Sequence, residues 1–385
     1  MSKNKRIAID ARAIANSGTG LCSYTDGIIK SCIKFENNYD FVFIIQKDDP
    51  YIETLTTSSR ILILETTIRK GDKFRRDLWQ QFTLPRILDK HAIDLYHGLD
   101  YAIPFGKTKF KKVVTLHDTA VFTEYDGRQL LFKKILRLNF KFAVKYCDQI
   151  ITDSNFSKDE IIKHFPNSKD KVTMIQLGIN EIYITQKIEA LNLNVLKKTN
   201  HCKNYLLYYG GFRKNKNVEL LLHAFDLLKN DSDLKLILVG NPGDAEMGLK
   251  ALVNSLNLDE RVIFYGFATE EELVTLLDNC RLFVFPSLFE GYGLPVLEAM
   301  TRGAAIVCSN KASLPEIGGN SIHYFNINSP ESLAQEIQYV LNNENYYNKL
   351  KIMAKERSQL LTWESSSRNL LAVYDSLLTS EPVNK

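Results

Sequence analysis

The sequence of 385 residues contains no apolar run near the roughly 20 residues that a membrane-spanning helix needs. Its first residues lead directly into a short apolar segment, without the long apolar stretch and small-residue cleavage site of a secretory signal. None of the six cysteines forms a Cys-x-x-Cys pair, so the spacing typical of zinc sites and dithiol redox centres is missing. We therefore expect a cytoplasmic protein whose cysteines are mostly reduced and partly buried.

Apolar residues make up 45% of the chain and charged residues 24%, values that are ordinary for a globular protein and atypical of disorder, collagen or coiled coil. At about 150 residues per domain, the length predicts two domains. The net charge of +4 is unevenly spread, because basic residues outnumber acidic ones in residues 1–180 and the reverse holds in the remainder. A basic first half suits an anionic surface or substrate, although an ordinary solvated surface explains it equally well.

Short apolar segments alternate with helical patterns twice along the chain. They are residues 6–11, 41–45, 60–64, 95–96, 113–116 and 149–152, and then 205–209, 234–239, 262–265, 282–285 and 305–308. This alternation predicts an α/β protein with two Rossmann-like, doubly wound parallel sheets. We expect a first domain, a linker rich in Asn, Lys and Thr, a second domain and a terminal helix at residues 1–178, 179–204, 205–362 and 363–385. Ligands of such sheets bind beyond the carboxyl ends of the strands, here in a cleft between the domains.

The segment Phe289–Met300 reads Phe-Glu-Gly-Tyr-Gly-Leu-Pro-Val-Leu-Glu-Ala-Met and joins a predicted strand to a predicted helix. The free backbone N–H groups before the helix, together with the helix dipole, predict an anion site suited to a diphosphate. These N–H groups belong to Gly291, Tyr292, Gly293 and Leu294. Glu290 in the loop and Glu298 in the helix are placed so that one carboxylate contacts a sugar ring and the other accepts hydrogen bonds from ribose hydroxyls.

The Glu-x7-Glu pattern in this segment resembles the signature of the retaining glycosyltransferases of the GT-B fold, specifically family 4. The resemblance covers nearly the whole chain, through Ile7–Arg12 with Gly18-Thr-Gly20, Asp94–His97, Val114–Asp118 and Tyr209–Asn217. Each segment is short, but their order and spacing follow the family. The resemblance implies that the first domain binds the acceptor, that the second binds a nucleotide sugar, and that the helix from Trp363 crosses back onto the first domain.

The same resemblance assigns roles to the charged residues of the second domain. It implies that Glu290 contacts the donor sugar, that Glu298 binds the ribose, and that Lys216 neutralises the diphosphate leaving group. The family usually pairs this lysine with an arginine directly after the glycine of the preceding strand. Gly211 occupies that position here, and we expect Arg213 to replace the arginine, because its guanidinium can bind phosphate through two hydrogen bonds.

Four further positions take a role from the resemblance. Phe267 falls where the family holds the nucleobase, and Gly20 would let the backbone approach the diphosphate from the first domain. His117 matches a histidine that hydrogen-bonds the reacting sugar or the transition state, and His97 either faces the acceptor or packs in the core. No metal ion or other cofactor is expected, since cationic side chains and a helix dipole would stabilise the diphosphate. Asp231-Ser-Asp233 is interpreted as a solvated turn.

The segment Trp79–Pro85 followed by Asp-Leu-Tyr-His resembles mannosyltransferases of bacterial surface-polysaccharide assembly, which favours mannose from GDP-mannose over the UDP sugars. The expected reaction is transfer of a hexose, with retention, to a saccharide or lipid-linked acceptor. A GT-B sugar-nucleotide epimerase is disfavoured by the signature around Glu290, and a non-catalytic saccharide-binding protein by the charged residues still present. A dehydrogenase is disfavoured because Ser23 replaces the third glycine of the dinucleotide fingerprint.

Residues 128–146 combine lysines and arginines with large apolar residues at helical spacing. Such a basic amphipathic helix can dock on the anionic inner face of a membrane, which would suit a lipid-linked acceptor. A helix that faces the core and has a basic exterior explains the pattern equally well. We expect no nucleic-acid partner.

Overall fold

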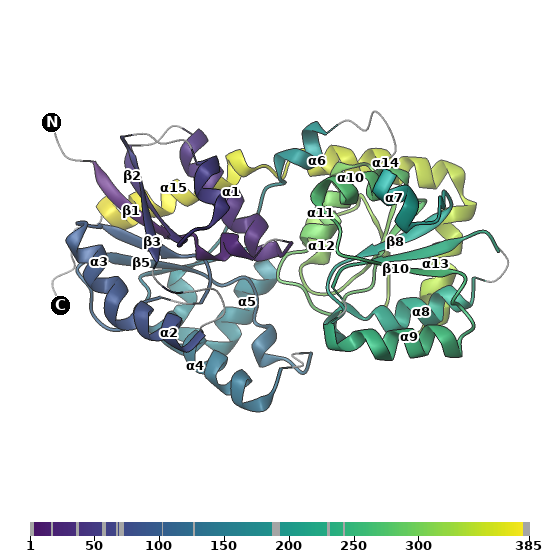
Figure 1. Cartoon of the computed structure of the whole chain (residues 1–385), viewed down its shortest axis with the longest axis horizontal. Helices are drawn as coiled ribbons and strands as arrows, with labels where there is room; N and C mark the ends of the chain where they lie inside the picture. The colour runs from purple at the N-terminus through teal and green to yellow at the C-terminus, as the bar shows by residue number, and fades with distance from the viewer. Residues whose placement is uncertain are drawn as a thin grey trace. The chain divides into compact units, whose positions relative to one another are not determined.

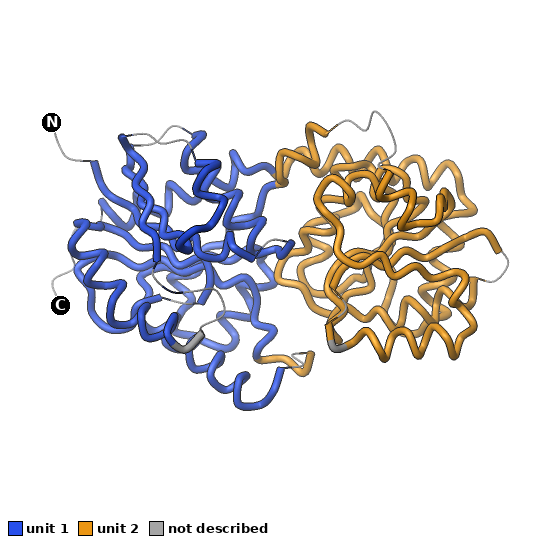
Figure 2. The backbone as a smooth tube through the Cα atoms, viewed as in Figure 1, with its two compact units in different colours: residues 1–121, 128–178, 362–385 blue, residues 122–127, 179–361 orange. Residues whose placement is uncertain are grey.

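The computed structural model describes residues 4–379 apart from residues 17, 36–37, 56–58, 67, 69–72, 102, 126–127, 187–192, 229–231 and 242. Asp231 and residues 380–385 therefore lie outside the described residues. The described residues form two compact units (Figure 2). One unit comprises residues 1–121, 128–178 and 362–385, and the other comprises residues 122–127 and 179–361.

The described strands of the first unit form a seven-stranded parallel sheet in the order β3-β2-β1-β4-β5-β6-β7. Their bounds are β1 Lys5–Asp10, β2 Tyr39–Gln46, β3 Ile61–Thr66, β4 Leu95–Gly98, β5 Lys111–Thr115, β6 Gln149–Thr152 and β7 Val172–Met174. Ile7, Ile9 and Phe43 are fully buried, as expected for a parallel sheet covered on both faces. β1 pairs with β2 on one side and with β4 on the other, so the winding reverses between β1 and β4.

The first unit contains helices on the sheet and the terminal helix of the chain. Their bounds are α1 Gly20–Lys34, α2 Lys73–Leu78, a π-helical turn Trp79–Thr83, α3 Leu84–Lys90, α4 Leu130–Tyr146, α5 Asn155–His164 and α15 Trp363–Thr379, with 3₁₀ turns at Arg12–Ala15, Pro50–Thr54 and Pro166–Lys171. Although α15 is the last element of the chain, it packs against α1. A Cβ atom at Gly27 of α1 would lie 2.0 Å from the ring of Trp363, so only glycine permits this approach.

The described strands of the second unit form a six-stranded parallel sheet in the order β10-β9-β8-β11-β12-β13. Their bounds are β8 Tyr205–Tyr209, β9 Lys235–Val239, β10 Val262–Gly266, β11 Leu282–Phe285, β12 Ile306–Ser309 and β13 His323–Phe325. β8 pairs with β9 on one side and with β11 on the other, so the winding reverses between β8 and β11.

Helices cover both faces of the second sheet, with α8 and α9 on one face and α10 and α11 on the other (Figure 1). The bounds are α6 Glu181–Thr185, α7 Leu193–Lys198, α8 Val218–Asp226, α9 Glu246–Ser255, α10 Glu270–Asn279, α11 Leu294–Thr301, α12 Leu314–Gly318, α13 Pro330–Asn342 and α14 Glu344–Ser358, with 3₁₀ turns at Lys214–Lys216 and Gly243–Ala245. A further 3₁₀ turn, Ala120–Phe122, includes residues of both units. Thr269 and Glu272 form a capping box at the start of α10, which sets where that helix begins.

The predicted fold class is confirmed, because both units are doubly wound parallel sheets. Two strands were missed, β7 and β13, which are edge strands of only three residues. The expected irregular linker contains α6 and α7, which pack on α10 and belong to the second unit. Within the described residues, no helix is both long enough and apolar enough to span a bilayer.

Candidate functional site

Two segments of the second unit meet where its sheet reverses its winding. Residues 210–217 follow β8 and residues 286–293 follow β11, and the carboxyl ends of these neighbouring strands lie side by side. The segments are bonded to each other, because the Asn215 amide donates to the carbonyl of Phe289 at 3.0 Å and the Leu288 N–H donates to the carbonyl of Asn215 at 2.7 Å. Doubly wound sheets bind their ligands at this place.

Lys216 and Glu290 form an ion pair within this region. The Lys216 ammonium lies 2.6 Å from Glu290 Oε1, and the side chains are only 17% and 12% exposed. The hydroxyl of Ser287 donates to the same oxygen at 2.5 Å. Lys216 is the last residue of its 3₁₀ turn, and Asn217 then adopts a left-handed conformation with φ 56° before α8 begins. Two residues that the sequence assigned to one ligand are therefore in direct contact.

The loop before α11 has the glycine-opened helix start that the sequence predicted. Gly293 caps the helix with φ 120°, Leu294 is its first residue, and a proline follows. A Cβ atom at Gly293 would lie 2.7 Å from the side chain of Leu314, so both the conformation and the space require glycine. Gly291 and Tyr292 are buried, and the hydroxyl of Ser313 donates to the Tyr292 carbonyl at 2.5 Å.

Glu298 is 5% exposed on α11, and its Oε2 atom has no hydrogen-bond partner among the described residues. Burial raises the pKa of Glu298 well above its usual range. Burial also raises the pKa of Tyr183 from α6, and the charge of Glu298 adds to that shift. A buried polar atom without a partner is rare and unfavourable in native proteins, so Glu298 is suited to a ligand that donates hydrogen bonds.

Arg213 and Phe267 are the exposed members of the predicted donor site. Arg213 directly precedes the 3₁₀ turn of Lys216, and no side-chain hydrogen bond joins it to another residue of the described ranges. Gly211 has no atom within 4 Å of the position that a Cβ would take. Phe267 follows β10 and is 57% exposed. The roles of Arg213 and Phe267 in donor binding stay predictions.

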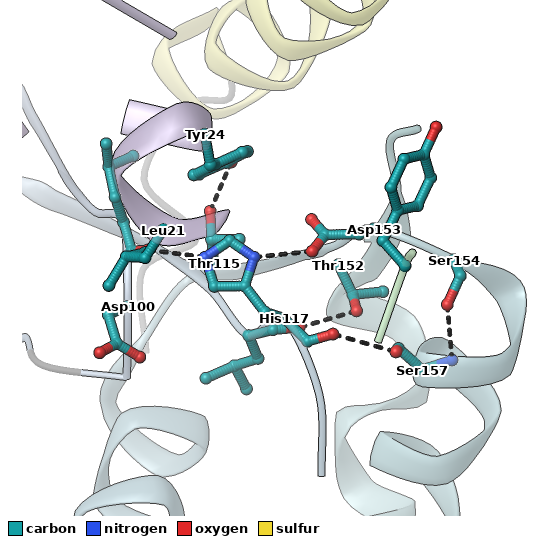
Figure 3. A network of polar contacts seen from close by, with 12 residues as sticks. Leu21, Tyr24, Asp100, Thr115, His117, Thr152, Asp153, Ser154 and Ser157 are labelled. Atoms are coloured by element: carbon teal, nitrogen blue, oxygen red, sulfur yellow. Dashed lines mark hydrogen bonds and ion pairs between the residues drawn. The ribbon is translucent and has the colours of Figure 1, made fainter. Parts of the chain in front are cut away.

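His117 lies beyond the carboxyl end of β5 in the first unit. Its Nδ1 is 2.6 Å from Asp153 Oδ2 (Figure 3). Its Nε2 is 3.0 Å from the carbonyl oxygen of Leu99. The edge of the ring packs against Tyr24, with 4.7 Å between ring centroids. Although burial alone lowers the pKa of His117, the negative charge and hydrogen bond of Asp153 raise it to about 9. Gly20, another predicted residue of this unit, is exposed as the first residue of α1.

Of the two roles expected for His97, acceptor contact or packing in the core, the structure favours packing in the core. Its side chain is fully buried, with Nδ1 2.6 Å from the Tyr374 hydroxyl and Nε2 2.8 Å from the Thr115 hydroxyl. Burial, which disfavours the charged ring, lowers its pKa to about 3. Both ring nitrogens are therefore occupied, and the histidine links α15 to the sheet.

Sequence reasoning missed Asp153 and Asp100, which lie near His117. Asp153 directly follows β6, and Asp100 is the second residue after β4. Burial raises the pKa of Asp100 to about 6, while the positive charge of His117 opposes that shift. His117 was predicted from the family resemblance alone; a search for polar residues just beyond buried strands would also have found these two carboxylates.

Comparison with known families identifies the class of protein that this fold and these residues define. Residues 38–181 match the model of Glycosyltransferase Family 4, and residues 195–357 match the model of Glycosyl transferases group 1. The two matches cover most of both units. The chain belongs to the GT-B glycosyltransferases of family 4, which confirms the resemblance found in the sequence.

Individual relatives agree with this assignment. The chain is 29% identical to O-antigen chain mannosyltransferase B of Escherichia coli over 288 residues, which is 74% of each protein. It is 32% identical to the serotype-specific mannosyltransferase WbdA of Escherichia coli over 239 residues, which is 60% of this chain and 29% of WbdA. The chain therefore spans less than a third of that longer relative.

Solved structures share the fold at low sequence identity. A glycosyltransferase from Rickettsia africae has a TM-score of 0.73 and 17% identity, covering 99% of this chain and all of the other. HepE of Anabaena in complex with UDP-glucose has a TM-score of 0.73 and 16% identity, covering 97% of this chain and all of the other. These similarities establish the fold alone.

Proposed function

We propose that this glycosyltransferase transfers a hexose from a nucleotide sugar to a saccharide or lipid-linked acceptor, with retention at the anomeric carbon. The observation that carries the proposal is the buried Glu298 carboxyl, whose Oε2 lacks a partner within the described residues, on the helix that follows the Lys216–Glu290 pair. A ribose diol supplies the two hydroxyl donors that a carboxylate of this kind can accept.

Different residues of the second unit bind different parts of the nucleotide-sugar donor. The N–H groups before α11 and the ammonium of Lys216 bind the diphosphate, and Lys216 stabilises the negative charge that develops as it leaves. Glu290 accepts hydrogen bonds from the sugar hydroxyls. The bond between the anomeric carbon and the phosphate oxygen breaks, a bond to the acceptor oxygen forms on the same face, and the acceptor proton passes to the departing phosphate.

Lys216 and the N-terminus of α11 supply the positive charge in this scheme, and we propose that no metal ion is required. Transfer should then continue at an unchanged rate after the protein is treated with a chelator. A loss of activity that added Mg²⁺ or Mn²⁺ restores would refute this part of the proposal.

Mannose is the favoured sugar, and surface-polysaccharide synthesis the favoured process. The support is similarity to proteins named as O-antigen and serotype-specific mannosyltransferases, from which this chain differs at about 70% of the aligned positions. A ligand that binds only the native state raises its melting temperature, so a thermal-shift panel of GDP-mannose and UDP sugars tests the donor directly. GDP-mannose should give the largest shift, and the shift should shrink in Glu298→Gln. Equal shifts in both proteins, or none with any nucleotide sugar, would contradict the proposal.

We also propose that the first unit docks on an anionic bilayer through one face of α4. Leu130, Leu131, Ile135 and Leu138 are 78%, 72%, 45% and 50% exposed there. Three lysines of α4 lie three or four residues from these apolar side chains or from one another: Lys134, Lys141 and Lys145. This spacing places the lysines on the same face of the helix as the apolar side chains. Exposed apolar side chains interleaved with positive charge match the interface of a bilayer that contains anionic lipid.

Co-sedimentation with vesicles that contain phosphatidylglycerol tests this docking. Binding should weaken with salt, and reversal of the three α4 lysines to glutamate should abolish it. The matched control is the same triple reversal in α14, at the exposed Lys349, Lys351 and Lys355. Equal loss in both variants would indicate a response to net charge alone, and absence of binding at low salt would refute the docking.

A further inference from the structure

Both ring nitrogens of His117 face oxygen atoms that accept hydrogen bonds. On one side Nε2 lies 3.0 Å from the carbonyl oxygen of Leu99, which can only accept. On the other side Nδ1 lies 2.6 Å from a carboxyl oxygen of Asp153, whose side chain is 3% exposed. If the carboxyl group is ionised, both nitrogens must carry a proton, and the ring is an imidazolium.

The backbone around this pair is fixed by further hydrogen bonds. The hydroxyl of Thr152 donates to the carbonyl of Leu116 at 2.7 Å. The hydroxyl of Ser157 donates to the carbonyl of His117 at 3.0 Å (Figure 3). Ser154 caps α5 by accepting from the Ser157 N–H at 3.1 Å. The ends of β5 and β6 and the start of α5 therefore hold the ring and the carboxylate in register.

We propose that Asp153 is a positioning residue that keeps His117 as an oriented imidazolium, so that this site presents a fixed positive charge instead of a general base. The inference rests on the proposed function and on the role that the family resemblance implies for His117, a hydrogen bond to the reacting sugar or the transition state. An imidazolium cannot take the proton of an acceptor hydroxyl. It can stabilise negative charge that develops on the reacting oxygens, and the acceptor proton then leaves with the phosphate.

The charged groups around the pair favour this protonation state. Asp100 and Asp153 both interact with the histidine, and Asp118 interacts with these two carboxylates. The basic groups that would oppose protonation of His117 are His97 and Arg76. His97 stays neutral in the core, and Arg76 interacts with Asp100.

Burial raises the pKa of Asp153, while the charge of His117 and its hydrogen bond lower it. Tyr24 packs its ring against the histidine, and burial keeps its hydroxyl un-ionised. The acidic groups next to His117 therefore outnumber the basic ones among the described residues.

A proton titration by NMR tests the inference without any sugar. The signal of His117 is assigned by its loss in His117→Gln, and its chemical shift is followed between pH 5 and pH 10. The native ring should stay protonated beyond pH 8. In Asp153→Asn, which keeps the shape of the side chain, the pKa of the ring should fall by at least about two units, towards or below its ordinary value near 6.5. The matched control is Asp159→Asn, an exposed residue of α5 with the same change of charge.

A pH profile of transfer supplies the second readout. Asp153→Asn should lower kcat at least about tenfold at pH 8 and much less at pH 6, because the ring regains its proton in acid. Asp159→Asn should leave the profile unchanged. If no nucleotide sugar supports transfer, the proposed function fails while the NMR titration still decides the protonation state.

Three results would overturn the inference. The first is a native His117 that titrates near its ordinary pKa. The second is a carboxylic acid C=O stretch in the infrared spectrum at neutral pH that disappears in Asp153→Asn, since the proton would then reside on Asp153 and the ring would be neutral. The third is an Asp153→Asn variant with unchanged titration and an unchanged pH profile.

Discussion

Replacement of Glu298 by glutamine should make the protein more stable than the native protein when no donor is bound. With the donor bound, the variant should gain less protection from the ligand than the native protein does. The carboxyl is buried, and its Oε2 has no partner in the part of the chain that the structure describes. Because burial raises its pKa in the folded state, the native protein holds this proton more tightly than the unfolded chain does. This tighter proton binding by Glu298 stabilises the folded protein in full below about pH 4.3, the ordinary pKa of a glutamate. The stabilisation is lost as the pH rises through the pKa of Glu298 in the folded protein.

The magnitude follows from the isolation of the carboxyl. A buried group without a hydrogen-bond partner destabilises a protein by about 1–3 kcal/mol, and more if it is charged. An amide of the same shape carries no charge, so Glu298→Gln should raise the free energy of unfolding at pH 7 by about 1–3 kcal/mol. The gain should shrink as the pH falls, because the native carboxyl then takes up a proton.

The two units can be followed separately in this assay. Both tryptophans of the chain, Trp79 and Trp363, belong to the first unit, so tryptophan fluorescence reports that unit alone. Hydrogen exchange of the backbone N–H groups of α11 reports the second unit. Exchange of α11 should slow in Glu298→Gln, while the tryptophan transition in urea stays in place. Addition of GDP-mannose should then protect α11 more in the native protein than in the variant.

Glu272 provides the matched control, because it is a glutamate of the same unit that is also 5% exposed. Its carboxylate accepts from the Thr269 N–H at 3.1 Å and pairs with Lys198 at 3.3 Å. Glu272→Gln should therefore destabilise the unit. If Glu298→Gln destabilises the second unit as Glu272→Gln does, the carboxyl of Glu298 is a structural group and the reasoning is refuted.

Three further outcomes are expected. Lys216→Met should lower kcat/KM by about 10²–10³-fold, the effect of removing one stabilising group from an oxyanion, and a fall below tenfold would argue against contact with the diphosphate. Tyr374→Phe should reduce stability of the first unit by about 1–3 kcal/mol, because Nδ1 of buried His97 loses its partner; an unmoved tryptophan transition would contradict this. Gly293→Ala should lower the free energy of unfolding of the second unit by about 1–3 kcal/mol, because alanine disfavours φ 120°. The variant should also bind the donor more weakly, which calorimetric titration with the donor checks.

The sequence predicted the parts of the site that depend on local order along the chain. Lys216 and Glu290 each follow a buried strand, and neighbouring parallel strands bring their carboxyl ends together. The turn before α11 could also be predicted from the sequence, since Gly293 and the proline two residues later are typical of a loop that opens a helix. These features need only strand order and turn chemistry.

Other features depend on contacts between distant segments, which the pattern of apolar residues does not encode. His97 is buried because Tyr374, 277 residues later, bonds to it. Asp153 meets His117 because β6 lies beside β5 in the sheet. The short edge strands β7 and β13 depend on pairing with a neighbour, since three residues give no periodic pattern of their own.

Most of the charged residues discussed above already have a partner within the protein, whereas Oε2 of Glu298 has none within the described residues. Lys216 and Glu290 neutralise each other at 2.6 Å, and Asp153 bonds to His117 at the same distance. A ligand that binds either pair must compete with an existing interaction, so these residues contribute to affinity only the difference between the old contact and the new one. Glu298 has no such partner for its Oε2 within the described ranges. Donor hydroxyls that reach it relieve an unfavourable state, and the nucleoside should therefore contribute more to donor affinity than the sugar does.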